Sequence, residues 1–310
     1  MRIFLTGVTG YIGSVIAEKL QAAGHTVVGL ARNHKTATRL EQRQIEPFLG
    51  DLQNPEGLAL AAQQADGVIH TAFIHDFDDW AGAVAADIQV IEAFTQALAG
   101  SGKPFIATSD TSVLGDTGTA IADENTPIAQ GFLLAERAKA EQAVLTAAQQ
   151  HIRSAVLRLP LYIYGRGGGT SYVPMRLEEA QALGVVHYVT SGNHQVSAVP
   201  VDDVAQLYVQ TLEQASAGSI FHAATESGIS ERAIAEAIGR VANTPTEAID
   251  FDAAVAKWGR GIATFFSINN QVSAQKAMQQ LGWQPQAEMT LLEDIASTVV
   301  KDTPDALSTD

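Results

Sequence analysis

Short apolar runs alternate with longer stretches of helical periodicity through the first half of the chain. Apolar runs of this length are typical of buried strands, and they lie at 3–5, 26–31, 45–49, 67–72, 104–108 and 154–159. The run at 45–49 is the weaker one because Pro47 interrupts it. Helical patterns lie between the runs, most clearly at 80–98 and 129–148. Strands that alternate with helices predict an α/β fold with a parallel sheet covered on both faces.

The pattern changes after Pro160. A glycine-rich loop at 165–169 follows. After it come short mixed elements whose ends are marked mainly by glycine and proline. We therefore expect two lobes, one over residues 1–160 and a smaller one over 161–310. No internal repeat or low-complexity linker separates them, so we expect them to share one continuous core surface.

The N-terminus carries the most informative local feature. The run at 3–5 leads into three glycines spaced three apart and then into a helical pattern. A strand that turns sharply into a helix places free backbone N–H groups and the helix N-terminus at one point, which attracts the pyrophosphate of a dinucleotide. Glycine removes the Cβ atoms that would block the turn and the ligand. The alternative is a glycine-rich turn without a ligand. We predict a cofactor-binding turn made by Thr6, Gly7, Thr9, Gly10, Tyr11, Ile12 and Gly13.

The residues after the second run indicate which dinucleotide binds. An acidic side chain there accepts the ribose hydroxyls of NAD, whereas basic side chains bind the additional phosphate of NADP. The position roughly 18–20 residues after the third glycine holds Ala31, Arg32 and Asn33, and none of these is a carboxylate. Arg32 can grip a phosphate through two hydrogen bonds, and Lys35 adds charge one helical turn further on. We therefore predict NADP(H), with NAD as the alternative if Arg32 instead stacks on the adenine.

Composition narrows the class of protein. The net charge of −15 argues against non-specific binding to nucleic acid or to an anionic membrane. No apolar run approaches the ~20 residues that span a bilayer, and the N-terminus lacks the longer apolar stretch of a signal peptide. The absence of cysteine excludes disulfides and cysteine nucleophiles, and no histidine pair has the spacing of a metal site. We expect a cytoplasmic protein that acts on a small molecule and binds no metal.

Six segments, in this order along the chain, resemble the extended and atypical short-chain dehydrogenase/reductases of the NAD-dependent epimerase/dehydratase-like family. They are the Thr-Gly-x-x-Gly-x-x-Gly start, Asp51-Leu52, His70-Thr71-Ala72, the stretch 157–165, the stretch 199–205 and Leu281-Gly-Trp283-Gln-Pro285. The resemblance implies a Rossmann-type doubly wound parallel sheet with a smaller C-terminal substrate lobe. It also implies a segment at about 196–214 that returns to the Rossmann domain.

The same resemblance assigns further cofactor contacts. Asp51 and Leu52 correspond to an acidic pair whose carboxylate meets the adenine amine. His70, Thr71 and Ala72 correspond to the segment that lies along the cofactor.

The catalytic pair of the family is missing at the matching positions. Members carry a Tyr-x-x-x-Lys pair on the fifth helix, in which the tyrosine relays a proton and the lysine lowers its pKa and holds the ribose. Such helices usually carry a glutamate four residues after the lysine. If Glu141 is that glutamate, Arg137 takes the lysine position and Leu133 the tyrosine position. If Lys139 is instead the lysine of the pair, Ala135 takes the tyrosine position. Neither alignment therefore supplies a phenol. Arg137 either donates hydrogen bonds to the ribose hydroxyls or forms a surface salt bridge, and it does not titrate.

The carboxyl edge of the sheet offers candidates to replace the tyrosine. The end of the fifth run places Asp110 at the usual serine position, with Ser109 and Thr111 on either side. His75 follows the fourth run and has a pKa suited to proton transfer near neutrality. The alternative is that His75 caps a helix or pairs with Asp78 or Asp79.

Three tyrosines at the start of the second lobe are further candidates, although most aromatic side chains at such a place only pack. They are Tyr162, Tyr164 and Tyr172. From both groups we select Ser109, Thr111, His75 and Tyr164 as the catalytic candidates.

Three classes of function remain open. The first is an NADP(H)-dependent oxidoreductase that acts on a small carbonyl or alcohol. The second is a nucleotide-sugar epimerase or dehydratase, which we disfavour because such reactions need an efficient tyrosine base, worth roughly 10²–10⁴ in rate. The third is a regulator that binds the cofactor without turnover, because fold alone does not choose among these functions. The sequence names no substrate.

The resemblance also bears on assembly. In many relatives the helices that correspond to 80–98 and 129–148 form a four-helix dimer interface, and the second is rich in alanine, which permits close approach. We therefore expect a homodimer. The alternative is that these alanines only favour helix formation on a solvated surface.

Overall fold

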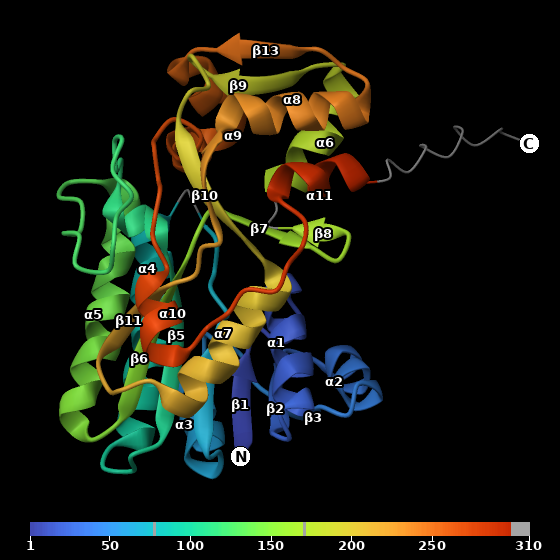
Figure 1. Ribbon diagram of the computed structural model, residues 1–310. Helices are drawn as coiled ribbons and strands as arrows, with labels where there is room; N and C mark the ends of the chain where they lie inside the picture. Colours follow the sequence, from blue (N-terminus) through green and yellow to red (C-terminus); the bar gives the residue numbers. More distant parts are fainter. Residues whose placement is uncertain (77–78, 170–171, 299–310) are drawn as a thin grey trace, which may run out of the picture.

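A seven-stranded parallel sheet forms the centre of the first lobe (Figure 1). The computed structural model describes residues 1–76, 79–169 and 172–298. The strand order is β11-β6-β5-β4-β1-β2-β3. The bounds are β1 Arg2–Thr6, β2 Thr26–Ala31, β3 Glu46–Leu49, β4 Gly67–His70, β5 Pro104–Asp110, β6 Arg153–Leu159 and β11 Ser219–His222. Because all strands are parallel, their carboxyl ends lie at one edge, which faces the second lobe.

Helices cover both faces of this sheet. They are α1 Tyr11–Ala22, α2 His34–Gln42, α3 Pro55–Gln64, α4 Trp80–Leu98, α5 Ala138–Ala147 and α7 Val201–Gln214. Ile3 and Leu5 of β1 pack with α1, α2 and α7, whereas Phe4 packs with α3, α4 and α5. Successive strand residues point to opposite faces, so a strand that is apolar throughout needs helices on both sides. The predicted α/β fold with a doubly wound parallel sheet is confirmed.

Two elements differ from the expectation. The predicted helix at 129–148 is wrong at its start, because Gly131 has a φ of 67°. The helical region begins as a 3-10 turn, η2 Leu133–Arg137, which leads into α5. Strand β4 ends at His70, two residues earlier than the apolar run. Pro47 lies within β3 without disrupting the ladder because β3 is an edge strand.

The second lobe contains two small sheets and four helices of the described chain. The four-stranded sheet has the order β12-β10-β7-β8, and β13 pairs with β9. The strands are β7 Tyr162–Gly165, β8 Gly168–Gly169, β9 Val186–Val189, β10 Gln195–Pro200, β12 Glu226–Ser230 and β13 Thr246–Ile249. The helices are α6 Tyr172–Leu183, α8 Glu231–Ala242, α9 Phe251–Phe265 and α11 Leu291–Ser297.

The chain returns to the first lobe after β10. Helix α7 packs against α1, and β11 then pairs with β6 in the large sheet. The returning segment that the sequence places around 196–214 therefore begins at α7 and continues through β11. Helix α10 (Gln275–Leu281) packs beside α7 and β11. No helix in the described ranges combines the length and the apolar composition needed to cross a membrane.

Candidate active site

The three glycines of the first turn have different surroundings. Gly7 has a φ of 72°, and a Cβ there would lie 2.4 Å from Thr71 Oγ1. A Cβ on Gly13 would lie 2.1 Å from the Gly7 carbonyl oxygen. A Cβ on Gly10 would meet only that same oxygen, at 3.2 Å. Gly7 and Gly13 are thus required by the protein itself, whereas Gly10 leaves room for a ligand.

The start of helix α1 suits an anion. Gly10 is its N-cap and provides no side-chain hydrogen bond, so the N–H groups of the first turn lack a side-chain cap. Such a helix N-terminus next to glycine is a binding site for a phosphate. Ile12 lies in this turn and lines the cavity described below, and Thr9 is exposed. These residues fit the diphosphate of a dinucleotide.

A buried network supports the turn from behind. Thr6 Oγ1 accepts hydrogen bonds from the backbone N–H groups of Thr71 and Ala72, each at 3.2 Å. It also lies 2.7 Å from His70 Nδ1, and His70 Nε2 lies 2.9 Å from Asp87. The His70 side chain, expected to lie along the cofactor, therefore uses both ring nitrogens within the protein. Thr6 and His70 position the cofactor turn from the interior.

The end of β2 presents positive charge to solvent. Arg32 and Lys35 are exposed, and neither side chain has a hydrogen bond or ion pair with the described residues. Between them Asn33 caps α2 by accepting a hydrogen bond from Thr36 N at 2.9 Å. Asp51 is exposed and accepts a bond from Gln53 N, while Leu52 packs against the core. The two cations are thus available to a ligand.

Tyr11 connects the cofactor turn to the second lobe. Its hydroxyl donates to the Gly165 carbonyl at 2.8 Å. Its ring lies so close to Gly168 that a Cβ there would approach it to 2.8 Å. Burial and the nearby carboxylates of Asp294 and Asp202 raise the pKa of the Tyr11 phenol. Tyr11 therefore joins the lobes rather than serving as a free donor.

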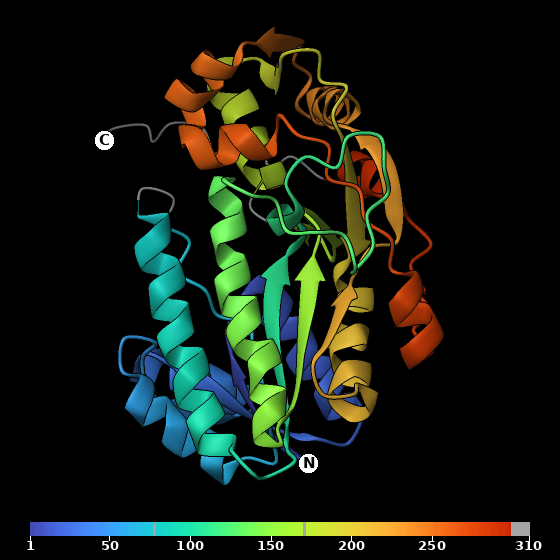
Figure 2. The same cartoon turned by 90° about the vertical axis from the view of Figure 1, so that its left-hand side faces the viewer.

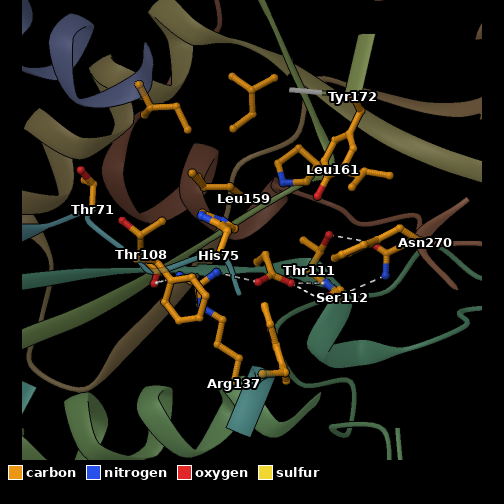
Figure 3. Close-up of a pocket in the computed structure, with 18 residues that line it drawn as sticks. Thr71, His75, Thr108, Thr111, Ser112, Arg137, Leu159, Leu161, Tyr172 and Asn270 are labelled. Atoms are coloured by element: carbon orange, nitrogen blue, oxygen red, sulfur yellow. Dashed lines mark hydrogen bonds and ion pairs between the residues drawn. The ribbon is translucent and has the colours of Figure 1, made fainter. Parts of the chain in front are cut away.

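A cavity of about 150 Å³ lies between the lobes at the carboxyl ends of the strands (Figure 3). Most of the surface area of its walls is apolar, and the apolar lining residues are Ile12, Phe73, Trp80, Leu159, Pro160, Leu161, Ile163 and Phe265. Its polar residues are Thr71, His75, Thr108, Ser109, Asp110, Thr111, Ser112, Arg137, Tyr172 and Asn270. An apolar cavity with a few convergent polar groups is typical of a small-molecule site, and this edge is where ligands bind in such folds. No cluster of three metal-ligating side chains occurs in the described chain.

Arg137 lies on the wall of this cavity and is buried. One guanidinium nitrogen donates to Asp110 Oδ2 at 2.8 Å and another to the Thr108 carbonyl at 3.1 Å. The guanidinium also stacks on the Phe73 ring, with its carbon 4.1 Å from the ring centre. Arg137 is therefore not a surface salt-bridge partner. Arg137 holds the carboxylate of Asp110, which stands at the family's serine position. The negative charge of Asp110 neutralises the positive charge of Arg137.

Two other polar candidates also line the cavity. The Thr111 hydroxyl donates to Asn270 Oδ1 at 2.5 Å, and Asn270 Nδ2 donates to the carbonyls of Thr111 and Gly115. Ser109 Oγ is buried and has no hydrogen-bond partner within the described residues. Asn270 belongs to no sequence motif that we recognised, so only the fold brings it to Thr111.

His75 lies at the mouth of the cavity, where its ring is 5.1 Å from that of Phe73. Burial and the positive charge of Arg137 lower the pKa of His75, so the imidazole is neutral near pH 7. Asp79 caps helix α4 by accepting a hydrogen bond from Gly82 N, and it forms no hydrogen bond or ion pair with His75. The alternative partner Asp78 lies outside the described residues, as does Phe77 of the same segment.

The three tyrosine candidates separate clearly. Tyr164 does not line the cavity, and its hydroxyl lies 2.5 Å from a Glu226 carboxylate oxygen and 2.8 Å from the Met289 carbonyl oxygen. The buried Tyr162 hydroxyl donates to Glu231 at 2.8 Å. Tyr172 lines the cavity, and Figure 3 shows its side chain pointing into it. Of these three tyrosines, Tyr172 lines the cavity, whereas the predicted Tyr164 does not.

Comparison with known proteins places these features in context. Residues 3–224 match the model of the NAD dependent epimerase/dehydratase family. An uncharacterized protein of Schizosaccharomyces pombe is 39% identical over 300 residues, which are 96% of this chain and 99% of that protein. A protein of Stigmatella aurantiaca named 4-hydroxy-2-methyl-3-oxo-4-farnesyl-3,4-dihydroquinoline-1-oxide ketoreductase is 26% identical over 238 residues, 71% of this chain and 67% of that one. The crystal structure of dTDP-glucose 4,6-dehydratase from Streptomyces venezuelae with NAD bound has a TM-score of 0.79 at 17% identity, covering 96% of this chain and 95% of that one.

Proposed function

The chain belongs to the NAD dependent epimerase/dehydratase family, and from this premise we propose that it is an NADP(H)-linked reductase of small, largely apolar carbonyl compounds. The substrate carbonyl and a proton, with the reduced cofactor, give an alcohol and the oxidised cofactor. A bound nicotinamide cofactor supplies the hydride for this chemistry. The chain's own residues hold the cofactor, exclude water and deliver the proton.

The lining of the cavity is the observation that carries the proposal. Arg137 is the only arginine or lysine among the described residues that line it, and Asp110 neutralises that charge. A sugar nucleotide carries a diphosphate, which arginine or lysine side chains ordinarily bind. An apolar cavity without a free cation favours an uncharged substrate. Its volume is near that of a cavity that holds a benzene-sized molecule, about 150 Å³.

The state of the polar groups favours the reductive direction. Oxidation of an alcohol needs a base, and burial and the Arg137 charge lower the pKa of His75, which makes its imidazole a weaker base. Reduction of a carbonyl needs a group that is protonated at neutral pH, and burial raises the pKa of the Tyr172 phenol. The Stigmatella aurantiaca relative is named a ketoreductase, which supports the same reaction class.

The choice of NADP(H) rests on Arg32 and Lys35, which are exposed beside the N-terminus of α2 and form no hydrogen bond or ion pair with the described part of the chain. One charge-assisted hydrogen bond to the additional phosphate is worth about 1.5–3 kcal/mol, or roughly a 10- to 100-fold preference.

The test is a screen of NADPH oxidation with uncharged aldehydes and ketones of three to eight carbons. dTDP-glucose and UDP-glucose are incubated separately with the cofactor and their products are separated by chromatography, because epimerisation and dehydration consume no cofactor. We expect turnover of the small carbonyl compounds and no conversion of either sugar nucleotide. Conversion of a sugar nucleotide would instead place the protein among the epimerases or dehydratases.

The variant Gly10→Val, in which we expect cofactor affinity to fall, serves as the inactive reference. Ala22→Val, at the exposed end of helix α1, is its matched control. Tight NADPH binding without turnover across the whole panel would contradict the reductase and favour a cofactor-binding regulator.

A further inference from the structure

We propose that Tyr172, the first residue of helix α6 in the second lobe, donates the proton to the substrate oxygen in this site. The inference rests on the proposed function and deepens it. In the family pattern this phenol stands on the fifth helix of the first lobe, where the present chain has Leu133 or Ala135. The structure supplies a phenol from the opposite wall of the same cavity.

The first argument is a count of the hydroxyl groups that line the cavity. Four of them already donate within the protein: Thr71 to the Thr6 carbonyl at 2.8 Å, Thr108 to the His70 carbonyl at 2.9 Å, Thr111 to Asn270 at 2.5 Å and Ser112 to the Asp110 carboxylate. Of the remaining two, Ser109 Oγ is buried without a hydrogen-bond partner, and no hydrogen bond joins the Tyr172 hydroxyl to another of the described residues. Only these two can give their hydrogen to a ligand without breaking an existing bond.

The second argument separates Tyr172 from Ser109. A proton donor must be acidic. Burial raises the pKa of the Tyr172 phenol, but a phenol is intrinsically far more acidic than an aliphatic hydroxyl, and Ser109 is buried as well. Ser109 Oγ is also fully buried against the first lobe, whereas the Tyr172 side chain points into the cavity (Figure 3). Ser109 is therefore suited to a supporting hydrogen bond, and Tyr172 to proton transfer.

The third argument is orientation. The Tyr172 ring packs against Tyr162, Phe265 and Phe266, with ring centres 6.4, 6.0 and 5.7 Å away. These three aromatic contacts fix the orientation of the Tyr172 ring. The hydroxyl is left directed at the cavity. Asp110 and the Arg137 guanidinium are the charged groups that act on the phenol across the cavity. A donor held in one orientation loses little entropy when the substrate binds.

The reaction balances with this assignment. The carbonyl carbon receives a hydride, with its electron pair, from the reduced nicotinamide cofactor. The π electrons of the carbonyl move onto oxygen, which takes the Tyr172 proton as the C–O double bond becomes single. The phenolate then takes a proton from water at the mouth of the cavity. No further oxidant or reductant is needed.

The activity test compares Tyr172→Phe with Tyr188→Phe. Tyr188 is a matched control because its hydroxyl accepts a bond from Arg232 in the second lobe, outside the cavity. We expect Tyr172→Phe to lower kcat by about 10²-fold or more with unchanged affinity for NADPH, and Tyr188→Phe to retain kcat. Tyr172→Leu repeats the comparison if the first variant does not fold. A Tyr172→Phe enzyme with the kcat of the unmodified protein overturns the inference and leaves the proposed reductase standing.

A binding test keeps the inference independent of turnover. Isobutyramide is an unreactive carbonyl compound with an apolar body, and its affinity for the NADPH-loaded protein is measured by calorimetry. We expect Tyr172→Phe to weaken binding about threefold to tenfold, as the loss of one neutral hydrogen bond requires. An unchanged amide affinity, or no binding by either protein, overturns the inference. Weakened amide binding without turnover of any carbonyl supports the Tyr172 contact and instead contradicts the proposed function.

Discussion

At the scale of single residues, the glycines of the cofactor turn serve two purposes. Gly10→Val adds its side chain toward the open side of the turn, so the protein should fold while affinity for the cofactor falls at least about 10- to 100-fold, the value of a lost phosphate hydrogen bond. Gly13→Ala instead drives a methyl group into the Gly7 carbonyl and should cost about 1–3 kcal/mol of folding stability or more. Calorimetry with NADPH and urea unfolding measure the two effects. Unchanged cofactor affinity in a folded Gly10→Val protein would contradict the phosphate-binding turn.

Cofactor preference also belongs to a single residue. Arg32→Ala should reduce affinity for NADPH about 10-fold or more and leave NADH affinity nearly unchanged, because only NADPH carries the additional phosphate. Arg39→Ala removes the same charge two turns away on the exposed side of α2, and we expect it to have little effect on either cofactor. Equal dissociation constants for NADPH and NADH in the unmodified protein would refute this prediction.

At the scale of elements, buried ionisable groups join β6, β11 and α5. Arg158 donates to both carboxylate oxygens of Glu141, at 2.9 and 2.7 Å, and His222 lies beside it at the end of β11. Burial and the Arg158 charge lower the pKa of His222 to about 3. Between that pH and the ordinary histidine value, about 6.5, the unfolded chain binds a proton that the folded chain does not.

This difference predicts how stability depends on pH. Stability from His222 is present above pH 6.5 and is lost as pH falls toward 3, by up to about 1.4 kcal/mol per pH unit. His222→Gln should remove this component, so the fall in unfolding free energy between pH 6.5 and 5 should be about 2 kcal/mol smaller than in the unmodified protein. Urea unfolding at the two pH values measures it, with the exposed His34→Gln as control. The same pH dependence in all three proteins would show that His222 does not titrate between the folded and unfolded states.

At the scale of the whole molecule, α4 and α5 lie side by side on the outer surface of the first lobe (Figure 2). Their exposed side chains are small or uncharged at many positions, among them Ala81, Ala85, Gln89, Gln142 and Thr146. We predict that two copies associate through these helices, because small side chains allow close helix contact. Sedimentation at micromolar concentration should give about twice the chain mass of 32.8 kDa, and Ala85→Glu should shift the particle toward the monomer by placing like charges together. A monomer of 32.8 kDa for the unmodified protein would contradict this prediction.

The sequence by itself determined six of the seven strands of the large sheet and the glycine turn, whereas β11 was not predicted. Both depend on patterns within short segments: apolar runs that must be buried on two faces, and glycines that a single strand-to-helix turn requires. The bounds of β2 and α4 agree with the sequence pattern for the same reason. The absence of the family's Tyr-x-x-x-Lys pair was also visible, because the pair belongs to one helix.

Only the tertiary structure decided which side chains meet in the cavity. Asn270 reaches Thr111 across 159 residues of sequence, and Tyr172 enters the cavity from the second lobe, while Tyr164, eight residues earlier, turns to Glu226 and Met289. Arg137 likewise became a buried partner of Asp110 rather than a surface cation. The direction and the partner of a side chain depend on how distant segments pack and on which polar groups must be satisfied once buried, and neither is encoded in local spacing.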